Sequence, residues 1–160
     1  MKLKSLNCGR TNVSDLSPLE GMPLIELYCY YTKVTDISPL KGMPLEQVRC
    51  QYSPIKSLAP LKGASLKGLE CHFSDIDDLE PLKEMQELWG LNIRSTKVTD
   101  LSPLKDLQNL KLLYFDFVAE RDTAILRSIK SLEVINETPV AAWWYELDKK
   151  QMEEKSSTEK

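Results

Sequence analysis

Apolar residues recur along most of the chain at a fixed period. Each repeat unit begins with Leu-x-x-Leu-x-Cys or a close variant. Further apolar residues follow at constant offsets, as at Val34, Ile37 and Leu40 in the second unit. The period is 21 residues at first and 22 afterwards. Repetition at this spacing indicates a repeat architecture. The units begin at Leu3, Leu24, Leu45, Leu66, Leu88, Leu110 and Leu132.

The length of one unit decides how the units are arranged. A segment of 21 or 22 residues cannot bury its own apolar face, so the units must stack in a solenoid in which each covers the next. The alternation of apolar and variable positions predicts a short strand with one face inward, and equivalent strands one coil apart pair in parallel. We therefore predict an α/β solenoid with a parallel sheet on its concave face and short 3₁₀ or α turns on its convex face.

The stretch after each strand predicts the convex turns. In Asp36-Ile37-Ser38-Pro39-Leu40-Lys41-Gly42, Ser38 fits the N-cap, Pro39 the first helical position, and Gly42 the end of the turn. We expect one 3₁₀ turn there in each coil. The later units lack the glycine and gain one residue, so their turns are predicted to be slightly longer.

The end of the chain departs from the repeat. An insertion at Asp122-Thr123 predicts an α-helical turn over the residues that follow, with Asp122 or Thr123 as its cap. Thr138 and Pro139 are predicted to cap and open a terminal helix over residues 139–152, which would cover the core of the last coil. The side chains expected to provide this cover are Trp143 or Trp144 with Leu147. The predicted organisation is a repeat domain over 1–137 with about six repeats and a partial seventh, a capping helix over 138–152, and a flexible tail over 153–160.

Two segments resemble a known family. Residues 34–40 (Val-Thr-Asp-Ile-Ser-Pro-Leu) and 98–104 (Val-Thr-Asp-Leu-Ser-Pro-Leu) are similar to bacterial leucine-rich repeats of the internalin type, and the match covers roughly residues 3–136. The Gly-Met-Pro-Leu joints at 21–24 and 42–45, with Ile135-Asn136, resemble repeat segments appended to some bacterial serine/threonine protein kinases. The resemblance implies a right-handed, horseshoe-shaped leucine-rich-repeat solenoid.

One position departs from the family pattern. The family usually carries asparagine at the ninth position of a unit, where its side chain bonds the backbone of neighbouring coils. A hydroxyl can make part of these bonds, but Val118 in the sixth unit cannot, so we expect the regularity to weaken there. The hydroxyl residues at this position are Thr11, Thr32, Ser53, Ser74 and Thr96.

Composition narrows the possible partners. The chain is 42% hydrophobic and 28% charged with a net charge of −3, which is typical of a globular domain and offers no dense basic surface for nucleic acid. No apolar run approaches the roughly eighteen residues of a membrane span, and no export signal is visible. We expect neither nucleic acid nor a membrane as a partner.

The four cysteines lie 21 residues apart and share one inward strand position. Sulfurs on successive strands form a row spaced by about 4.8 Å, whereas zinc requires a tetrahedron. We interpret them as core residues, with a metal site as the less favoured alternative, and unpaired thiols favour a reducing, cytoplasmic location. The residues are Cys8, Cys29, Cys50 and Cys71.

Catalytic residues are scarce. Cys71 is followed by His72, the single histidine, but adjacent strand residues point to opposite faces, so the thiol and the imidazole cannot act together. No phosphate-binding loop or kinase catalytic sequence occurs. We predict no enzymatic activity and no cofactor, and a small hydrolase using His72 is kept only as an alternative to test.

The outward strand positions are unusually aromatic. Tyrosine and arginine are enriched among interface hot spots, and Gly68 and Gly90 leave a shallow depression that a peptide or loop could occupy. Aromatic residues at the strand ends, including Tyr52 and Phe73, either pack on each other as a spine or contact a partner. The predicted partner-binding residues are Tyr28, Tyr30, Arg49, His72, Arg94 and Tyr114.

Besides the hydrolase alternative, two functions remain open. The first is a non-catalytic module that binds a protein or peptide across the concave sheet. The second is a self-associating structural or regulatory fragment of a larger protein, such as a kinase-linked repeat region, because Leu3 begins a unit at once and leaves the first coil without a polar cap. A homodimer would then form through this coil.

Overall fold

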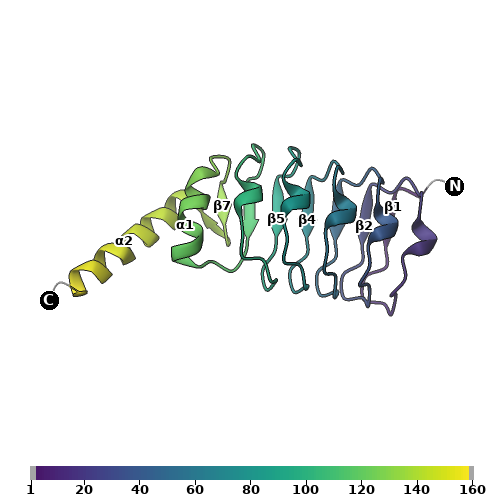
Figure 1. Ribbon diagram of the computed structural model, residues 1–160, viewed down its shortest axis with the longest axis horizontal. Coiled ribbons are helices and arrows are strands. Elements are labelled where there is room, and N and C mark those ends of the chain that lie inside the picture. The colour runs from purple at the N-terminus through teal and green to yellow at the C-terminus, as the bar shows by residue number, and fades with distance from the viewer. Residues whose placement is uncertain (1–2, 159–160) are drawn as a thin grey trace.

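The computed structural model describes residues 3–158 and shows a solenoid with one sheet along its whole length (Figure 1). Within these residues the strands are hydrogen-bonded in chain order, parallel from β1 to β7, with β8 antiparallel to β7. The predicted α/β solenoid with a parallel sheet is confirmed. The strands are β1 (Ser5–Asn7), β2 (Glu26–Tyr28), β3 (Gln47–Arg49), β4 (Gly68–Glu70), β5 (Gly90–Asn92), β6 (Leu112–Tyr114), β7 (Val134–Ile135) and β8 (Thr138–Pro139).

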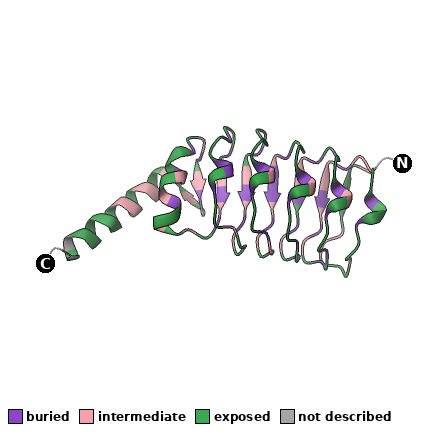
Figure 2. Ribbon diagram, viewed as in Figure 1, coloured by how far each residue is buried: buried purple, intermediate pink, exposed green. Residues whose placement is uncertain are grey.

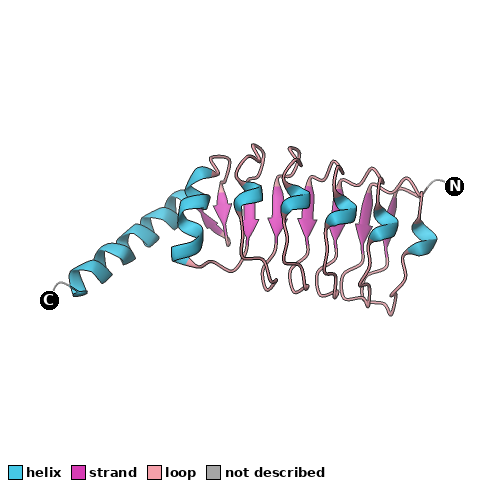
Figure 3. Cartoon of the chain, viewed as in Figure 1, coloured by secondary structure: helices cyan, strands magenta, loops and turns pink. Residues whose placement is uncertain are grey.

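A row of single 3₁₀ turns lies on the side of the core opposite the sheet (Figure 3). Each turn contributes a buried leucine, such as Leu40, and each strand from β2 to β6 contributes a buried central residue, such as Leu69, so the core lies between the two rows (Figure 2). The side of the sheet turned away from this core, which we predicted to be concave, is called the open sheet face below. The turns are η1 (Ser17–Leu19), η2 (Ser38–Leu40), η3 (Ala59–Leu61), η4 (Glu80–Leu82) and η5 (Ser102–Leu104).

The predicted cap of these turns is wrong. Ser38 is the first residue of η2 and makes no side-chain cap bond; instead Asp36 Oδ1 accepts the Ser38 N–H at 2.8 Å and Oδ2 accepts the Ser38 hydroxyl at 2.7 Å. These bonds lower the pKa of Asp36, the backbone N–H contributing most. Gly42 closes the turn with φ of 75°, as predicted. Lys83 has a helical conformation after η4, but η4 and η5 span three residues like the earlier turns, so the predicted lengthening of the turns themselves is wrong.

Hydroxyl groups bond the backbone at the ninth position of the units. Thr32 Oγ1 donates to the Cys29 carbonyl at 2.7 Å, and Ser53 Oγ donates to the same carbonyl from the next coil at 2.9 Å. Val118 has no hydroxyl, and there the pattern changes as expected. Its N–H donates at 2.8 Å to Oδ2 of Asp122, so a side chain four residues later stabilises the backbone of this coil.

Helix α1 (Ala119–Ser128) begins earlier than predicted. Asp122 and Thr123 were expected to cap it but lie inside it. The Asp122 carboxylate reaches back to the Val118 N–H that precedes the helix, is 1% exposed, and pairs with Arg121 at 2.6 Å. The valine at the ninth position and the early helix are therefore parts of one local arrangement.

The chain ends in a hairpin and a long helix rather than in a capped helix alone. Thr138 and Pro139 form β8, so they neither cap nor open the helix, and α2 runs from Val140 to Thr158. Residues 153–158 are therefore helical where we predicted a flexible tail, while residues 159–160 lie outside the described residues. Trp143 and Trp144 pack against the core of the last coil, in agreement with their predicted covering role.

Candidate protein-binding face

The six predicted partner-binding residues fall into two rows at the sheet. Tyr28, Arg49 and Tyr114 occupy the last residue of their strands, in one register row with Glu70 and Asn92. The other three lie two residues later in their units, just beyond the strands. The predicted set is therefore not one continuous patch. The three residues of the second row are Tyr30, His72 and Arg94.

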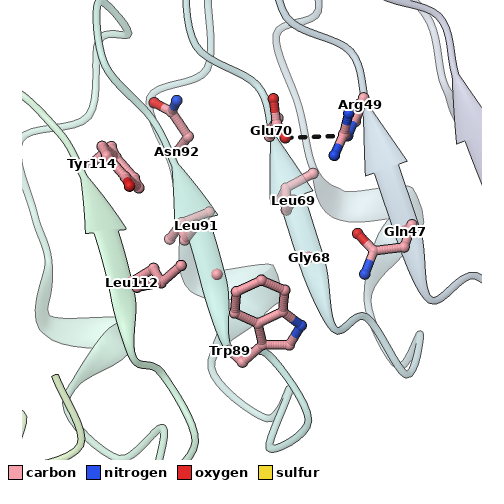
Figure 4. A pocket seen from close by; sticks show the side chains of 11 residues that line it. Gln47, Arg49, Gly68, Leu69, Glu70, Trp89, Leu91, Asn92, Leu112 and Tyr114 are labelled. Carbon is pink, nitrogen blue, oxygen red and sulfur yellow. Dashed lines mark ion pairs between the residues drawn. The ribbon is translucent and has the colours of Figure 1, made fainter. Parts of the chain in front are cut away.

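Arg49 joins its neighbours along the first row. Its guanidinium lies 5.5 Å from the centroid of the Tyr28 ring, and its Nε lies 3.1 Å from Oε1 of Glu70 (Figure 4). Arg94 makes a similar cluster further along, with its guanidinium 5.3 Å from the centroid of Tyr114 and an ion pair to Glu137 at 3.2 Å. Each arginine is thus fixed between an aromatic ring and a carboxylate, a geometry suited to protein contacts.

A hollow of about 310 Å³ lies between these two clusters. The depression predicted at Gly68 and Gly90 is present, but the two glycines differ. The side-chain amide of Gln47 occupies the space above Gly68, whereas nothing lies within 4 Å of the position that a Cβ on Gly90 would take. We call this the Gly90 hollow. Its lining is Gln47, Arg49, Gly68, Leu69, Glu70, Trp89, Gly90, Leu91, Asn92, Leu112 and Tyr114.

Trp89 is the lining residue that sequence reasoning missed. It is 44% exposed, and Figure 4 shows its indole over the open sheet face beside Gly68. The neighbouring coils carry Lys67 and Lys111 at the same position, each paired with a glutamate at 2.8 Å. Apart from Ile25, the other units carry a charged residue at this position, so a single tryptophan among them is the signal that could have identified it.

The strand-end aromatics form a second feature. The rings of Tyr31 and Tyr52 stack with centroids 4.1 Å apart and an interplanar angle of 7°, and Tyr52 stacks on Phe73 at 4.5 Å and 12°. Of the two alternatives left open for the strand-end aromatics, packing on one another is confirmed for these three, which we call the aromatic stack. They nevertheless stay 47%, 37% and 49% exposed, so a partner can reach their edges. Phe117 does not join them, because it packs against Phe115 and Trp143.

Two of the predicted residues belong to this stack rather than to the hollow. Tyr30 lies edge-on to Tyr31 at 6.5 Å, and His72 lies edge-on to Tyr52 and Phe73 at 5.5 and 5.8 Å. Burial lowers the pKa of His72, which favours the neutral imidazole at pH 7. Arg49 and Tyr114 are the predicted residues that line the Gly90 hollow.

Comparison with known proteins gives the fold and no nearer relationship. No protein-family model matches the chain, and no curated protein sequence matches it. Among solved structures, an internalin (inlF) from Listeria monocytogenes is 24% identical with a TM-score of 0.61, over 84% of this chain and 47% of its own. Internalin C2 from the same species is 23% identical with a TM-score of 0.66, over 83% of this chain and 70% of its own.

The fold is a leucine-rich-repeat solenoid of the internalin type. The chain spans 47% of the length of the first of these neighbours, and at these identities the likeness concerns the fold. The expected likeness to kinase-appended repeats stays a prediction.

The interior of the leucine-rich-repeat coils holds the thiols as predicted. Cys29, Cys50 and Cys71 are buried and Cys8 is half-buried, and all four are free. Burial raises the pKa of Cys29 and of Cys71 to about 12. Cys71 faces the core while His72 lies at the surface beside the stack, as the alternation predicted.

Residues 3–158 contain neither a candidate metal site nor a candidate membrane-spanning helix. No group of three or more histidine, cysteine, aspartate or glutamate side chains is placed to hold a metal ion. No helix in this part of the chain has the length and apolar character needed to cross a membrane.

Proposed function

We propose that this chain is a non-catalytic protein-interaction module that binds a segment of a partner protein on the open sheet face, with the Gly90 hollow as the main contact. The observation that carries the proposal is the hollow itself, a space of about 310 Å³ beside the exposed Trp89. Concave sites with apolar walls and a few polar groups are typical binding sites, and tryptophan, tyrosine and arginine dominate interface hot spots.

The lining supports a particular kind of partner segment. Trp89 and Leu112 give the hollow apolar walls, while the amides of Gln47 and Asn92 offer hydrogen bonds. The one ion pair at its border, between Arg49 and Glu70, is internally neutralised. The proposed partner segment is therefore neutral, places an apolar side chain over Gly90, and offers backbone groups to the amides. The net charge of −3 gives nucleic acid little electrostatic attraction.

A filled hollow tests the proposal. A random peptide library is selected on the intact chain, and the enriched peptides are measured against Gly90→Leu. The added side chain meets nothing within 4 Å of its Cβ, so the variant should fold while the hollow closes. We expect the peptides to lose at least about tenfold in affinity, because the space for their apolar side chain is gone.

Ser5→Leu is the matched control. Ser5 stands in the same register row as Gly90, but on β1 at the N-terminal end of the sheet. There its hydroxyl donates to the Glu26 carboxylate at 2.8 Å. This variant adds the same leucine to the same face and should leave binding unchanged. Unchanged binding by Gly90→Leu would refute the hollow as the contact.

A second candidate function has its own support. Leu3, Leu6 and Val13 in the first coil are only partly buried, and β1 pairs with a strand on one side only within the described residues. Self-association through this coil would cover them. Sedimentation velocity at two concentrations tests it, since a dimer predicts a concentration-dependent sedimentation coefficient.

The cytoplasmic location is likewise a proposal, supported by the free thiols.

A further inference from the structure

The aromatic stack has one covered end and one uncovered end. At the first end, the guanidinium of Arg10 lies over the Tyr31 ring, 5.8 Å from its centroid. At the other end, the coil after Phe73 carries Ser95 at the equivalent position. A serine side chain is too short to cover a phenyl ring, and Phe73 remains 49% exposed. The last face of the stack is therefore available to another group.

The backbone at Ser95 has the conformation of a position that carries a ring. Its φ is 53°, against 52°, 57° and 55° for Tyr31, Tyr52 and Phe73. Left-handed backbone is unfavourable for residues other than glycine, and here it directs four successive side chains in the same way. A planar group held above Ser95 would lie parallel to Phe73 and extend the stack by one member.

The carboxylate of Asp116 lies next to Ser95, at the open end of the stack. The N–H groups of Tyr31, Tyr52 and Phe73 donate to backbone carbonyls of the next coil at 2.9, 3.0 and 2.9 Å. The Ser95 N–H instead donates at 2.7 Å to Oδ2 of Asp116, an exposed residue. The negative charge of Asp116 therefore lies on the far side of Ser95 from Phe73.

The cations near the open end of the stack are each held by other groups. Arg121 Nη2 donates at 3.1 Å to the backbone carbonyl of Asp116, but its guanidinium is paired with the buried carboxylate of Asp122 at 2.6 Å. Arg94 is held by Glu137 at 3.2 Å and by the Asn136 side-chain oxygen at 3.3 Å, over the ring of Tyr114. His72 lies at the edge of Phe73, half-buried. The open end of the stack thus combines an aromatic face with a carboxylate, which is the pairing that a planar cation requires.

We infer that the open end of the aromatic stack binds an arginine side chain of a partner protein, with the guanidinium on the face of Phe73 above Ser95 and its charge opposite Asp116. Arg10 provides the same contact within the chain at the Tyr31 end. Lysine fits less well, because its ammonium is more strongly hydrated and is not planar. This inference does not depend on the Gly90 hollow, since the two sites share no residue.

Nuclear magnetic resonance titration of the intact chain tests the inference. The probe is the blocked peptide Gly-Gly-Arg-Gly-Gly, with matched peptides carrying lysine, neutral planar citrulline or phenylalanine in its place. We expect the arginine peptide to shift the ring signals of Phe73 and to bind about two- to fivefold more tightly than the lysine and citrulline peptides.

Variants locate the binding. Ser95→Tyr should abolish it by completing the stack within the chain, while Ser95→Ala, with the same backbone and no ring, should retain it. Asp116→Asn keeps an oxygen for the Ser95 N–H and should weaken binding by removing the charge, and Gly90→Leu should have no effect. Equal binding of arginine and lysine peptides, preference for phenylalanine, or full binding by either Ser95→Tyr or Asp116→Asn would overturn the inference.

Discussion

The two ends of the solenoid are built differently. At the C-terminal end, Trp143 and Trp144 on α2 cover the last coil, and Trp143 meets Phe117 edge-on at 5.3 Å. In the first coil, Leu6 is only partly buried, although Leu27 at the same offset in the next coil is fully buried. A repeated unit supplies one side of a core that the next unit completes. An end is covered only by residues that the repeat does not contain.

The interior coils should therefore be the most sensitive to loss of core volume. Leu69→Ala removes a side chain that is 1% exposed and should lower the free energy of unfolding by about 2–5 kcal/mol. Leu6→Ala at the same offset in the first coil should lower it by roughly half as much or less, because solvent already reaches that site. Urea denaturation measures both, and equal losses would contradict the difference between the coils.

Thiol labelling extends this comparison without mutation. Cys50 is fully buried and its pKa is raised well above the ordinary value by burial, whereas Cys8 is half-buried. We expect Cys8 to react with a thiol reagent at least about a hundredfold faster than Cys50, which must wait for the coil to open. Site-resolved mass spectrometry during labelling measures the rates. Similar rates for the two thiols would contradict the difference in burial between the first coil and the interior coils.

The C-terminal end should depend on a buried carboxylate. Asp122→Ala removes the acceptor of the Val118 N–H and the partner of Arg121, and should lower the free energy of unfolding by about 1–3 kcal/mol. Glu120→Ala, an exposed change on the same helix, is the control and should have little effect. Denaturation of both variants decides the matter, and a neutral Asp122→Ala would show that the helix forms without this contact.

The smallest effect concerns the turns opposite the sheet and depends on pH. Because bonds to Ser38 lower the pKa of Asp36 in the folded chain below 3.8, ionised Asp36 stabilises the fold above that pH, and the contribution is lost as the pH falls through the lower folded value. Asp36→Asn should therefore be less stable than the parent near neutral pH, and the difference should shrink at about pH 3 or below. A difference that is constant with pH would contradict the role of the charge.

The sequence predicted what the repeat determines and missed what single side chains determine. Parallel pairing, buried cysteines and 3₁₀ turns follow from periodicity, because identical units can stack in only one register. The cap assigned to Ser38 was wrong because Asp36 and Ser38 are both capping residues, and only the backbone course distinguishes them.

The binding face shows the same limit. The two glycines predicted a depression, which is open only at Gly90, because the side chain of Gln47 covers Gly68. The exposure of Trp89 depends in the same way on neighbouring coils whose side chains pair away from it. Such contacts join residues 21 or more positions apart, so local pattern does not reveal them.

The central claim is that a partner segment binds on the open sheet face. Calorimetric titration of a library-selected peptide tests it most directly, by comparing a variant at the hollow with a variant on the opposite side of the solenoid. Trp89→Ala should weaken binding by about 2 kcal/mol or more, while Lys62→Ala, just after η3, should change it little beyond a screened surface charge. Equal losses in the two variants, or a loss confined to Lys62→Ala, would contradict binding on the open sheet face.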